Sequence, residues 1–319
     1  MASGQVHVVF GAGQIGTPLA KRLRGLGHEV RLARRSSAPA PEGVTPLVGD
    51  AGDPSFVADA ARGARALYHC MNPAYDRRVW ARELPRLMSS LIAAAGRAGA
   101  RLVVLDNLYM LGDGGGRPLN EDTPVAPRSR KGEIRAQVAA MLFEAHRRGE
   151  VRAVSGRASD FFGPGGTQTY FGDAFWPRVI AGKSAQVLSN PDIQHTYHYT
   201  LDVAAGLAAL GTAEDDVTGR WWMLPAVPAE TTRALIARFA TALGHEIRVE
   251  RIPAWMLDLM ALFVPLLREV SEMRYQWEQP LVVDDRRFRE RFGQTPTSLD
   301  DGARATVAWA REHYKRRGS

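Results

Sequence analysis

The chain has 319 residues, of which 45% are hydrophobic and 24% charged, and this composition is typical of a folded protein with a sizeable buried core. Its formal net charge is +7, but the arginines are scattered and not interleaved with aromatic residues, so we expect no nucleic-acid partner. The single cysteine, Cys70, excludes an internal disulfide and is typical of a reducing cytoplasm.

No apolar stretch of the sequence indicates export or membrane insertion. The opening stretch "MASGQVHVVFGAG" has no basic region and no signal-length apolar run, so we expect a cytoplasmic protein. The most apolar segment, "WMLDLMALFVPLLREV", contains Asp258 and Pro265 and is too short to span a bilayer. We predict that it forms a buried or lobe-packing helix and that the protein has no membrane partner.

Short apolar runs alternate with amphipathic stretches along the first half of the chain. Near-continuous apolar strands that alternate with helices form parallel sheets covered on both faces, so we predict a doubly wound, Rossmann-type α/β fold. The predicted strands are 6–10, 29–33, 44–48, 66–71, 101–106 and 151–156, and the predicted helices lie near 14–26, 54–62, 76–98 and 131–148.

The first predicted strand runs directly into "GAGQIG", which opens the first predicted helix. In this context Gly11, Gly13 and Gly16 permit a tight turn and a close approach of backbone N–H groups to a pyrophosphate. The helix N-terminus then favours the negative charge. We therefore predict a dinucleotide site that also includes Gln14 and Ile15, within the same turn.

The end of the second predicted strand selects the dinucleotide. An NAD site has an acidic residue there for the ribose 2′-hydroxyl, but this chain has Arg34 and Arg35 at that place, and Glu29 comes too early. Two guanidinium groups suit a 2′-phosphate, so we predict NADP(H) as the cofactor. Asp50 ends the third strand and is placed to meet the adenine. Asn72 follows the fourth and is placed near the adenosine ribose or the pyrophosphate.

After about residue 160 the sequence becomes rich in glycine, proline and aromatic residues. We predict a core at 1–160 and a smaller substrate lobe at 161–319, from which a segment at about 190–215 returns to the core. Ligands bind at the carboxyl ends of the strands in such sheets. We therefore predict a roomy aromatic substrate pocket, which favours an apolar or aromatic small molecule over a sugar nucleotide. Its predicted residues are Asp160, Phe161, Phe162, Tyr170, Trp176, His195 and Tyr197.

Within "QHTYHYT", alternation places His195, Tyr197 and Tyr199 on one face and Thr196 and His198 on the other. We expect one of these two sets to line the pocket. No cluster of His, Cys, Asp and Glu has the spacing of a metal site, so we predict no metal.

Several segments together resemble the extended short-chain dehydrogenase/reductase superfamily, in the NAD-dependent epimerase/dehydratase-like branch. They are the glycine-rich opening, "GD" after the third strand, "LDNLYMLG", "SDFFGPG" and "HTYHYTLDVA". The resemblance spans nearly the whole chain and implies the fold. It leaves the activity open, because the superfamily includes reductases, epimerases, dehydratases and non-catalytic sensors. It also implies that a homodimer can form through the helices predicted at 76–98 and 131–148.

Typical members of that superfamily use a Ser or Thr in the segment that matches "LDNLYMLG", followed by a Tyr-x-x-x-Lys motif. Here none of the eight tyrosines is followed four residues later by a lysine. The resemblance places Asn107 at the Ser/Thr position, Lys131 at the Tyr position and Arg135 at the Lys position. The chain therefore resembles an atypical member in which all three catalytic residues are replaced.

The replacements differ in the chemistry that they can perform. Asn107 can polarise a carbonyl through its amide but supplies no proton. If the strand continues past Asp106, its period of two puts Tyr109 on the face of Asn107, where Tyr109 can serve as the acid. The alternative for Tyr109 is an aromatic side chain that packs beneath the lobe.

Lys131 and Arg135 are four residues apart and share one helix face. Their like charges repel each other unless a negative group lies opposite, such as a cofactor phosphate or a substrate carboxylate. A partly desolvated lysine can act as acid or base, whereas Arg135 is better suited to clamp the cofactor. The alternative is an exposed basic helix start.

The leading hypothesis from the sequence is an NADPH-dependent reductase that delivers hydride to a carbonyl or a conjugated C=C or C=N bond. The first alternative is a sugar-nucleotide epimerase or dehydratase, against which the missing Tyr–Lys pair argues. The second is a non-catalytic NADP(H)-binding sensor or partner protein.

Overall fold

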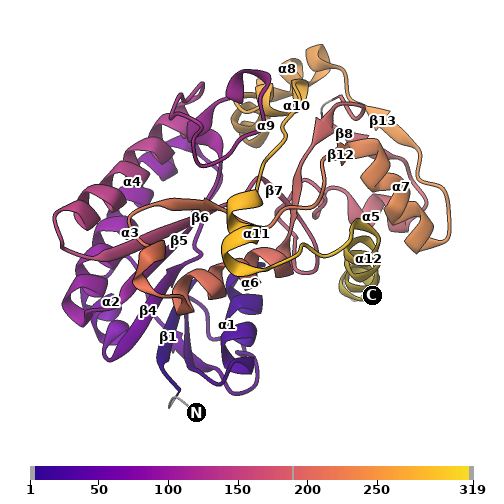
Figure 1. Ribbon diagram of the computed structural model, residues 1–319. Helices are drawn as coiled ribbons and strands as arrows, with labels where there is room; N and C mark the ends of the chain where they lie inside the picture. The colour runs from indigo at the N-terminus through magenta and orange to yellow at the C-terminus, as the bar shows by residue number, and fades with distance from the viewer. Residues whose placement is uncertain (1–3, 189, 316–319) are drawn as a thin grey trace.

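A seven-stranded parallel sheet forms the centre of the molecule (Figure 1). The structure is a computed structural model that describes residues 4–188 and 190–315. All neighbouring strands run parallel in the order β11-β6-β5-β4-β1-β2-β3, which confirms the predicted Rossmann-type fold. The strands are β1 (Val6–Phe10), β2 (Glu29–Arg34), β3 (Thr45–Val48), β4 (Ala64–His69), β5 (Arg101–Asp106), β6 (Arg152–Arg157) and β11 (Trp221–Met223).

The six predicted strands agree with the structure to within two residues at each end. The seventh, β11, was not predicted, because three residues are too short to show a period. It extends the sheet beside β6 and, together with α6 (Thr200–Thr212), places residues of the 200–223 region against the sheet. The two-domain division at residue 160 stays a prediction.

Helices cover both faces of the sheet. On one face α2 (Pro54–Ala61), α3 (Arg77–Ala98) and α4 (Arg130–Arg147) bury Val57, Leu84 and Leu142 against the strands. On the other face α1 (Gly16–Gly25) and α6 bury Leu19 and Leu207. This two-sided burial explains why the strands are apolar along their whole length.

Side-chain caps begin the two helices that lead to the site. The Asp76 carboxylate accepts hydrogen bonds from the Arg78 and Val79 N–H groups at the start of α3. The Ser129 hydroxyl accepts one from the Gly132 N–H at the start of α4. These caps satisfy backbone donors that lack partners within the helix and so fix where each helix begins.

The remaining elements form the lobe and its connections. Its core is aromatic, with Phe171, Phe175 and Phe239 in edge-to-face contacts at ring-centre distances of 5.1–6.0 Å. Helix α12 (Leu299–Lys315) closes this core by packing on α7 (Thr232–Leu243). The elements are η1 (Tyr109–Leu111), η2 (Gly114–Gly116), β7 (Asp160–Phe162), α5 (Trp176–Ile180), β8 (Ala185–Val187), β9 (Gln194–His195), β10 (Tyr197–Tyr199), η3 (Asp215–Val217), β12 (Glu230–Thr231), α7 (Thr232–Leu243), β13 (Val249–Arg251), α8 (Ala254–Ala261), α9 (Pro265–Ser271), α10 (Tyr275–Glu278), α11 (Arg286–Phe292) and α12 (Leu299–Lys315).

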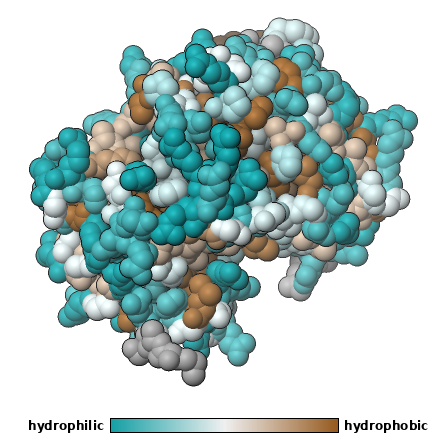
Figure 2. All heavy atoms as spheres, viewed as in Figure 1, coloured by the Kyte–Doolittle hydropathy of each residue, from teal (hydrophilic) through white to brown (hydrophobic). Residues whose placement is uncertain are grey.

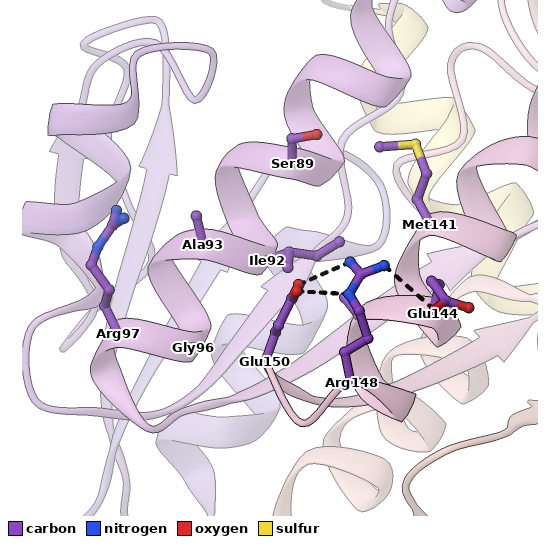
Figure 3. A pocket seen from close by; sticks show the side chains of 10 residues that line it. Ser89, Ile92, Ala93, Gly96, Arg97, Met141, Glu144, Arg148 and Glu150 are labelled. Atoms are coloured by element: carbon purple, nitrogen blue, oxygen red, sulfur yellow. Dashed lines mark hydrogen bonds and ion pairs between the residues drawn. The ribbon is translucent and has the colours of Figure 1, made fainter.

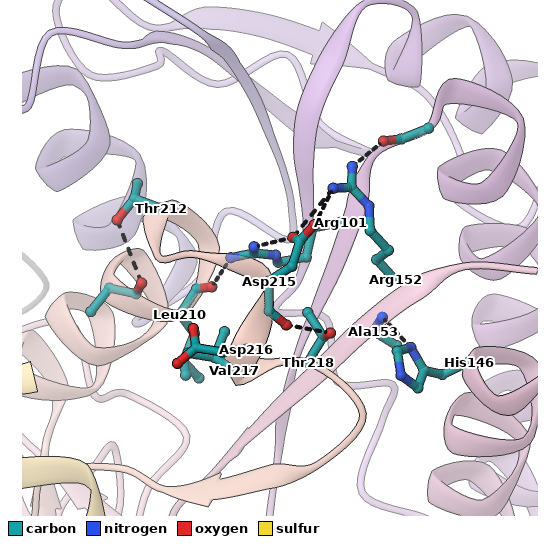
Figure 4. A network of polar contacts seen from close by, with 12 residues as sticks. Arg101, His146, Arg152, Ala153, Leu210, Thr212, Asp215, Asp216, Val217 and Thr218 are labelled. Carbon is teal, nitrogen blue, oxygen red and sulfur yellow. Dashed lines mark hydrogen bonds and ion pairs between the residues drawn. The ribbon is translucent and has the colours of Figure 1, made fainter. Parts of the chain in front are cut away.

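A buried arginine ties the connection after α6 to the edge of the sheet (Figure 4). The Arg101 guanidinium, fully buried at the start of β5, donates to the Leu210 carbonyl at 2.7 Å and to the Asp215 carboxylate at 2.6 Å. Arg152 at the start of β6 donates to the same carboxylate at 2.9 Å. Asp215 thus joins two strands to the segment that leads into β11.

The prediction of one buried or lobe-packing helix over the most apolar segment is wrong. Two helices, α8 and α9, form there, because Val264 is extended and the residue before a proline disfavours helical backbone. The exposed fraction is 68% for Trp255 and 80% for Phe263. Elsewhere hydrophilic residues predominate on the face seen in Figure 2, with hydrophobic residues in small groups between them. Across residues 4–188 and 190–315, no helix has the length and apolar character that a membrane span needs.

Candidate functional site

The glycine-rich turn between β1 and α1 has the geometry of a phosphate-binding turn. Gly11 has a φ of 106°, and a Cβ there would lie 2.8 Å from the Cys70 carbonyl group. A Cβ at Gly16 would overlap the Gly11 carbonyl oxygen. Gly13, by contrast, faces open space, with no atom within 4 Å of the position of a Cβ. The turn therefore leaves room for a dinucleotide at Gly13 while it packs tightly at the other two glycines.

Two residues of the turn differ in what they can offer a ligand. The Ile15 side chain is 3% exposed and packs in the core, so only its backbone is available. The Gln14 side-chain oxygen is buried and, among the described residues, has no hydrogen-bond partner. Gly165 and Gly166, in the loop after β7, lie against Gln14. A buried acceptor without a partner next to the open position at Gly13 is consistent with a ligand that completes the site.

The basic pair at the end of β2 lies on the surface. The Arg34 guanidinium donates to the carbonyls of Ala38 and Pro39 at 3.0 and 2.9 Å, which fixes its direction. Arg35 is exposed and makes no side-chain hydrogen bond or ion pair with the described residues. Asp50 is also exposed and accepts from the Gly52 N–H at 2.9 Å. Within the part of the chain that the structure describes, no acidic side chain bonds to either arginine.

Arg135 joins the carboxyl ends of β4 and β5. Its guanidinium donates to the Asn72 side-chain oxygen at 2.6 Å and to the Asp106 carboxylate at 3.3 Å. It also stacks 4.4 Å from the ring centre of Trp80 on α3. Arg157 on β6 approaches the same Asp106 carboxylate at 4.0 Å. Arg135 is thus held rigidly at the sheet edge where a cofactor in this fold would lie.

The fifth strand spans the predicted residues 101–106 and does not extend past Asp106, so the condition that would place Tyr109 on the strand face of Asn107 is not met. β5 ends at Asp106, and the Asp106 carboxylate accepts from the Asn107 N–H at 2.9 Å. The Asn107 side-chain oxygen then accepts from the Tyr109 N–H at 3.1 Å, which bends the chain into η1. The Asn107 amide NH₂ is not used in this turn and stays available to polarise a substrate group.

Tyr109 nevertheless lies within the site. Its hydroxyl is 3.3 Å from that of Tyr75, and its ring stacks on Trp80 at a centre distance of 6.1 Å. Burial, together with Tyr75 and the Asp160 carboxylate nearby, holds the pKa of Tyr109 well above its usual value. The hydroxyl is therefore protonated at neutral pH, where it can donate a hydrogen bond to a substrate oxygen, but it is a weaker acid than an exposed tyrosine and cannot act as a base.

Lys131 is completely buried, so the alternative of an exposed basic helix start is wrong. Its ammonium group donates to the Glu269 carbonyl at 3.0 Å, to the Glu272 carboxylate at 2.9 Å and to the Glu269 carboxylate. It also lies 4.8 Å from the ring centre of Tyr75. The negative groups opposite Lys131 thus come from α9 and the residue that follows it, and they use all three of its donors.

Asp160 and His195 form the second polar group of the site. The Asp160 carboxylate accepts from His195 Nε2 at 2.8 Å and from Trp277 Nε1 at 3.0 Å. His195 is 3% exposed, and Tyr170 packs 5.7 Å from the Trp277 ring. This group lies near Tyr109, whose pKa the Asp160 charge helps to raise.

Most of the predicted aromatic pocket is lobe core. Phe162, Trp176 and Tyr197 are at most 2% exposed and belong to one hydrophobic cluster, and the Tyr197 hydroxyl bonds to that of Thr232 at 2.8 Å. Phe161 packs on the sheet side. Neither alternating set of "QHTYHYT" lines a pocket as a whole, because this segment runs through the interior with both faces covered.

Five residues of the site were missed by sequence reasoning, and three-dimensional proximity alone identifies them. They are Tyr75, Trp80, Glu269, Glu272 and Trp277. The sequence shows that Glu269 and Glu272 are three residues apart, but it does not indicate that they contact Lys131. Among the described residues, no group of three or more His, Cys, Asp and Glu is placed to hold a metal ion.

A hollow of about 740 Å³ lies elsewhere, between α3 and α4 (Figure 3). Ile92, Met141 and Arg148 line it, and the Arg148 side chain bonds to Glu150 at 2.7 Å and pairs with Glu144. None of the predicted site residues lies in this hollow. It lies between the two helices through which the family resemblance implies that a homodimer can form.

Comparison with known proteins gives one family and many structures of the same fold. The model of the NAD dependent epimerase/dehydratase family matches residues 7–223. A search of the curated proteins found no match. The chain is similar to DesIV, a dTDP-glucose 4,6-dehydratase from Streptomyces venezuelae with NAD and TYD bound, at 18% identity and a TM-score of 0.79, with 98% of each chain covered.

Two further solved structures are similar to the chain over nearly their whole length. The UDP-glucose 4-epimerase of Thermus thermophilus in complex with NAD is 20% identical, with a TM-score of 0.76, and 96% of this chain and 99% of that chain are covered. The Bordetella bronchiseptica enzyme WbmH in complex with NAD⁺ is 17% identical, with a TM-score of 0.72, and 97% and 99% are covered. At these identities the likeness shows the fold.

Proposed function

The chain belongs to the NAD dependent epimerase/dehydratase family, and on that premise we propose that it is a nicotinamide-dinucleotide-dependent enzyme that acts on a sugar nucleotide by epimerase- or dehydratase-type chemistry. The observation that carries this proposal is the family match over residues 7–223, which includes the glycine turn and the ends of β4, β5 and β6. Ligands bind at this edge of open α/β sheets.

This proposal replaces the reductase hypothesis as the leading one. The reductase hypothesis relied on an aromatic pocket for an apolar substrate, but most of the aromatic residues in question are lobe core. The side chains gathered at the site include polar groups, among them Asn107 and Asp160. A polar lining suits a substrate with several hydroxyl groups better than an apolar one.

The residues of the cofactor half fit a dinucleotide. We propose that the turn at Gly11–Gly16 holds the pyrophosphate, with Gly13 as the point of closest approach. Arg34 and Arg35 favour NADP(H) over NAD(H), because a 2′-phosphate would find two guanidinium groups and no acid at the end of β2. When bound, the cofactor supplies a hydride acceptor or donor.

The chain's own residues supply polarisation, and oxidation of a sugar hydroxyl also needs a group that takes up its proton, for which we propose the Asp160 carboxylate. Asn107 offers its free amide NH₂ to a substrate oxygen, and Tyr109 offers a hydroxyl that stays protonated at neutral pH. Arg135 holds Asn72 and Asp106 in place and presents a fixed positive charge at the sheet edge. These roles are part of the proposal, since the missing Tyr–Lys pair leaves no standard acid and base.

The test is a titration followed by turnover. Tryptophan fluorescence with NADPH, NADP⁺, NADH and NAD⁺ measures cofactor affinity. Incubation with UDP-glucose and dTDP-glucose, followed by NMR, detects a change at the sugar. We expect tight NADP(H) binding and a modified sugar. NADPH oxidation against ketones and enones, without change in any sugar nucleotide, would instead support the reductase.

A second candidate function is a non-catalytic NADP(H)-binding sensor. The observation that favours it is the state of Lys131, whose three donors are all used within the chain. A sensor would bind NADPH tightly and turn over no member of either substrate panel.

We also propose that two copies of the chain form a dimer through the surface of α3 and α4. Sedimentation of the purified protein would reveal this dimer.

A further inference from the structure

Residues 254–278, which comprise α8, α9 and α10 and are called the strap below, make several polar contacts with the rest of the molecule. Among the strap's described residues, the hydrophobic side chains of Leu257 and Met273 are buried, but none belongs to the hydrophobic clusters of the sheet or the lobe. Leu262 and Phe263, between α8 and α9, are 75% and 80% exposed. Segments with few buried apolar contacts open at a low free-energy cost, and lids over binding sites are drawn from such segments.

The strap forms ion pairs with Lys131 of α4. Glu269 and Glu272, one turn apart on and just after α9, both meet the Lys131 ammonium group. Lys131 is fully buried, and the exposed fractions of the two glutamate side chains are 6% and 19%. Burial acts to raise the pKa of Glu272, but its bonds with Lys131 outweigh this effect, so its pKa lies below the usual value.

The two carboxylates also cap two helices of the core. The Glu269 carboxylate accepts from the Arg77 N–H at 3.0 Å, at the first residue of α3. The Glu272 carboxylate accepts from the Lys131 N–H at 3.0 Å, in the first turn of α4. Two helix N-termini and one ammonium group therefore converge on this point, and each favours negative charge.

A second set of contacts brings the strap to the substrate side of the site. Trp277 donates to the Asp160 carboxylate at 3.0 Å and packs on Tyr170. The strap thus touches both polar groups of the site, the one around Lys131 and the one around Asp160. A substrate that reaches Lys131 has to replace contacts that the strap makes.

We propose that the strap is autoinhibitory: Glu269 and Glu272 occupy an anion-binding position formed by Lys131 and the first N–H groups of α3 and α4, and a phosphate or carboxylate of the substrate displaces them. The charge and the donors at this position suit an anionic oxygen group, and the chain's own carboxylates now fill it. The inference rests on the proposed function only in that the displacing group belongs to the substrate.

Hydrogen–deuterium exchange tests the strap without any turnover. We expect Glu269→Gln/Glu272→Gln to speed exchange of peptides within 265–278 by about tenfold or more, because the substitutions remove the charged hydrogen bonds between the strap and Lys131. Glu278→Gln is the matched control: it removes a like charge from the same segment, where Glu278 pairs with Arg274 at 3.0 Å. Equal exchange in the double variant and the control overturns the proposal.

Faster exchange in the double variant could also come from general destabilisation by the unpaired, buried Lys131. A variant that lacks this lysine separates the two explanations. Lys131→Met/Glu269→Gln/Glu272→Gln removes the charges on both sides, so no buried cation lacks a partner. Peptides of β5 serve as the internal reference for global unfolding. The strap should still exchange faster than in the wild type, while β5 does not. If the strap stays protected in this triple variant, other contacts hold it and the proposal fails.

Competition tests the anion position itself. Calorimetric titration with inorganic phosphate and with UDP should give at least about tenfold tighter binding to Glu269→Gln/Glu272→Gln than to the wild type, because the internal competitor is removed. Lys131→Met in the same background should abolish the gain. If the wild type, the double variant and the variant that also carries Lys131→Met bind phosphate and UDP with equal affinity, the proposal that an anion displaces the two glutamates is wrong. Cofactor binding is measured separately, so loss of NADPH binding would count against the proposed function and not against the strap.

Discussion

Gly16 lies so close to Gly11 that a Cβ at residue 16 would overlap the Gly11 carbonyl oxygen. Gly13, two residues from Gly11, has open space where its side chain would be. The same turn therefore has one glycine that the fold requires and one beside which the fold leaves space.

This difference predicts opposite results for two substitutions. Gly13→Val should leave the melting temperature nearly unchanged but weaken NADPH binding by about a hundredfold or more, because the side chain fills the space for the pyrophosphate. Gly16→Ala should lower stability by a few kcal/mol through the clash with backbone. Thermal unfolding and fluorescence titration measure both effects. A Gly13→Val protein with unaltered NADPH affinity would place the cofactor elsewhere.

The basic pair at the end of β2 predicts a cofactor preference. Arg35→Ala removes an exposed side chain without a partner among the described residues, so stability should not change. The Kd for NADPH should rise about tenfold or more, as for the loss of a hydrogen bond to a charged group, while the Kd for NADH stays the same. Lys21, also exposed and outside the site, gives the matched control Lys21→Ala. Parallel losses for NADPH and NADH would contradict the assignment.

Tyr109 gives a prediction for the chemical step. Tyr109→Phe keeps the ring on Trp80 and loses only the hydroxyl next to Tyr75. If this hydroxyl donates the proton, turnover should fall by roughly 10²–10⁴, with cofactor affinity unchanged. Tyr75→Phe is the paired control, since it removes the other hydroxyl of the same contact. Full activity in Tyr109→Phe would leave Tyr109 with a packing role only.

The position of the glycine-rich turn and of the strand ends around it was predictable from the sequence, because these signals are local. Gly11, Gly13 and Gly16 lie within six residues, directly between β1 and α1, and the arginines follow at the end of β2. The strands were equally accessible, since burial on both faces makes each one a continuous apolar run. Local patterns of this kind need no knowledge of what packs on them.

The surroundings of Lys131 were less predictable, because the contacts there join distant segments. Lys131 and Glu269 are separated by 138 residues, and neither neighbourhood identifies the other. The aromatic residues after residue 160 were interpreted as a pocket, yet aromatic side chains also build lobe cores, as Trp176 does at 0% exposure. Composition could not separate these two uses.

Asp215 gives a prediction for stability. Its carboxylate pairs with Arg101, which is fully buried, and with Arg152 (Figure 4). Asp215→Asn leaves the Arg101 charge without its anionic partner, so the free energy of unfolding should fall by about 1–3 kcal/mol, less than for a pair buried on both sides because Asp215 is 52% exposed. Asp216→Asn, at an exposed pair with Arg291, is the control and should cost about 0–1 kcal/mol in urea unfolding.

Three buried histidines predict how stability depends on pH. Burial lowers the pKa of His7 and of His69 to about 3 and that of His198 to about 4, from a usual value of 6.5. The unfolded chain therefore binds protons below about pH 6.5 that the folded chain does not. The stability that these groups contribute is complete above pH 6.5 and is lost progressively as the pH falls toward their folded pKa values.

The slope of stability against pH isolates one of these residues. Each such histidine should remove up to about 1.4 kcal/mol per pH unit well below pH 6.5, so the wild type should lose several kcal/mol by about pH 5. His7→Asn keeps an acceptor for the Tyr68 hydroxyl, which lies 2.9 Å from His7 Nδ1, and removes the titration. Urea unfolding between about pH 8 and about pH 5 measures the free energy of unfolding at each pH. In His7→Asn this free energy should fall less steeply as the pH drops below about 6.5, by the contribution of one bound proton. An unchanged slope would mean that His7 is already protonated in the folded protein, which its complete burial beside His28, at a ring-centre distance of 4.3 Å, argues against.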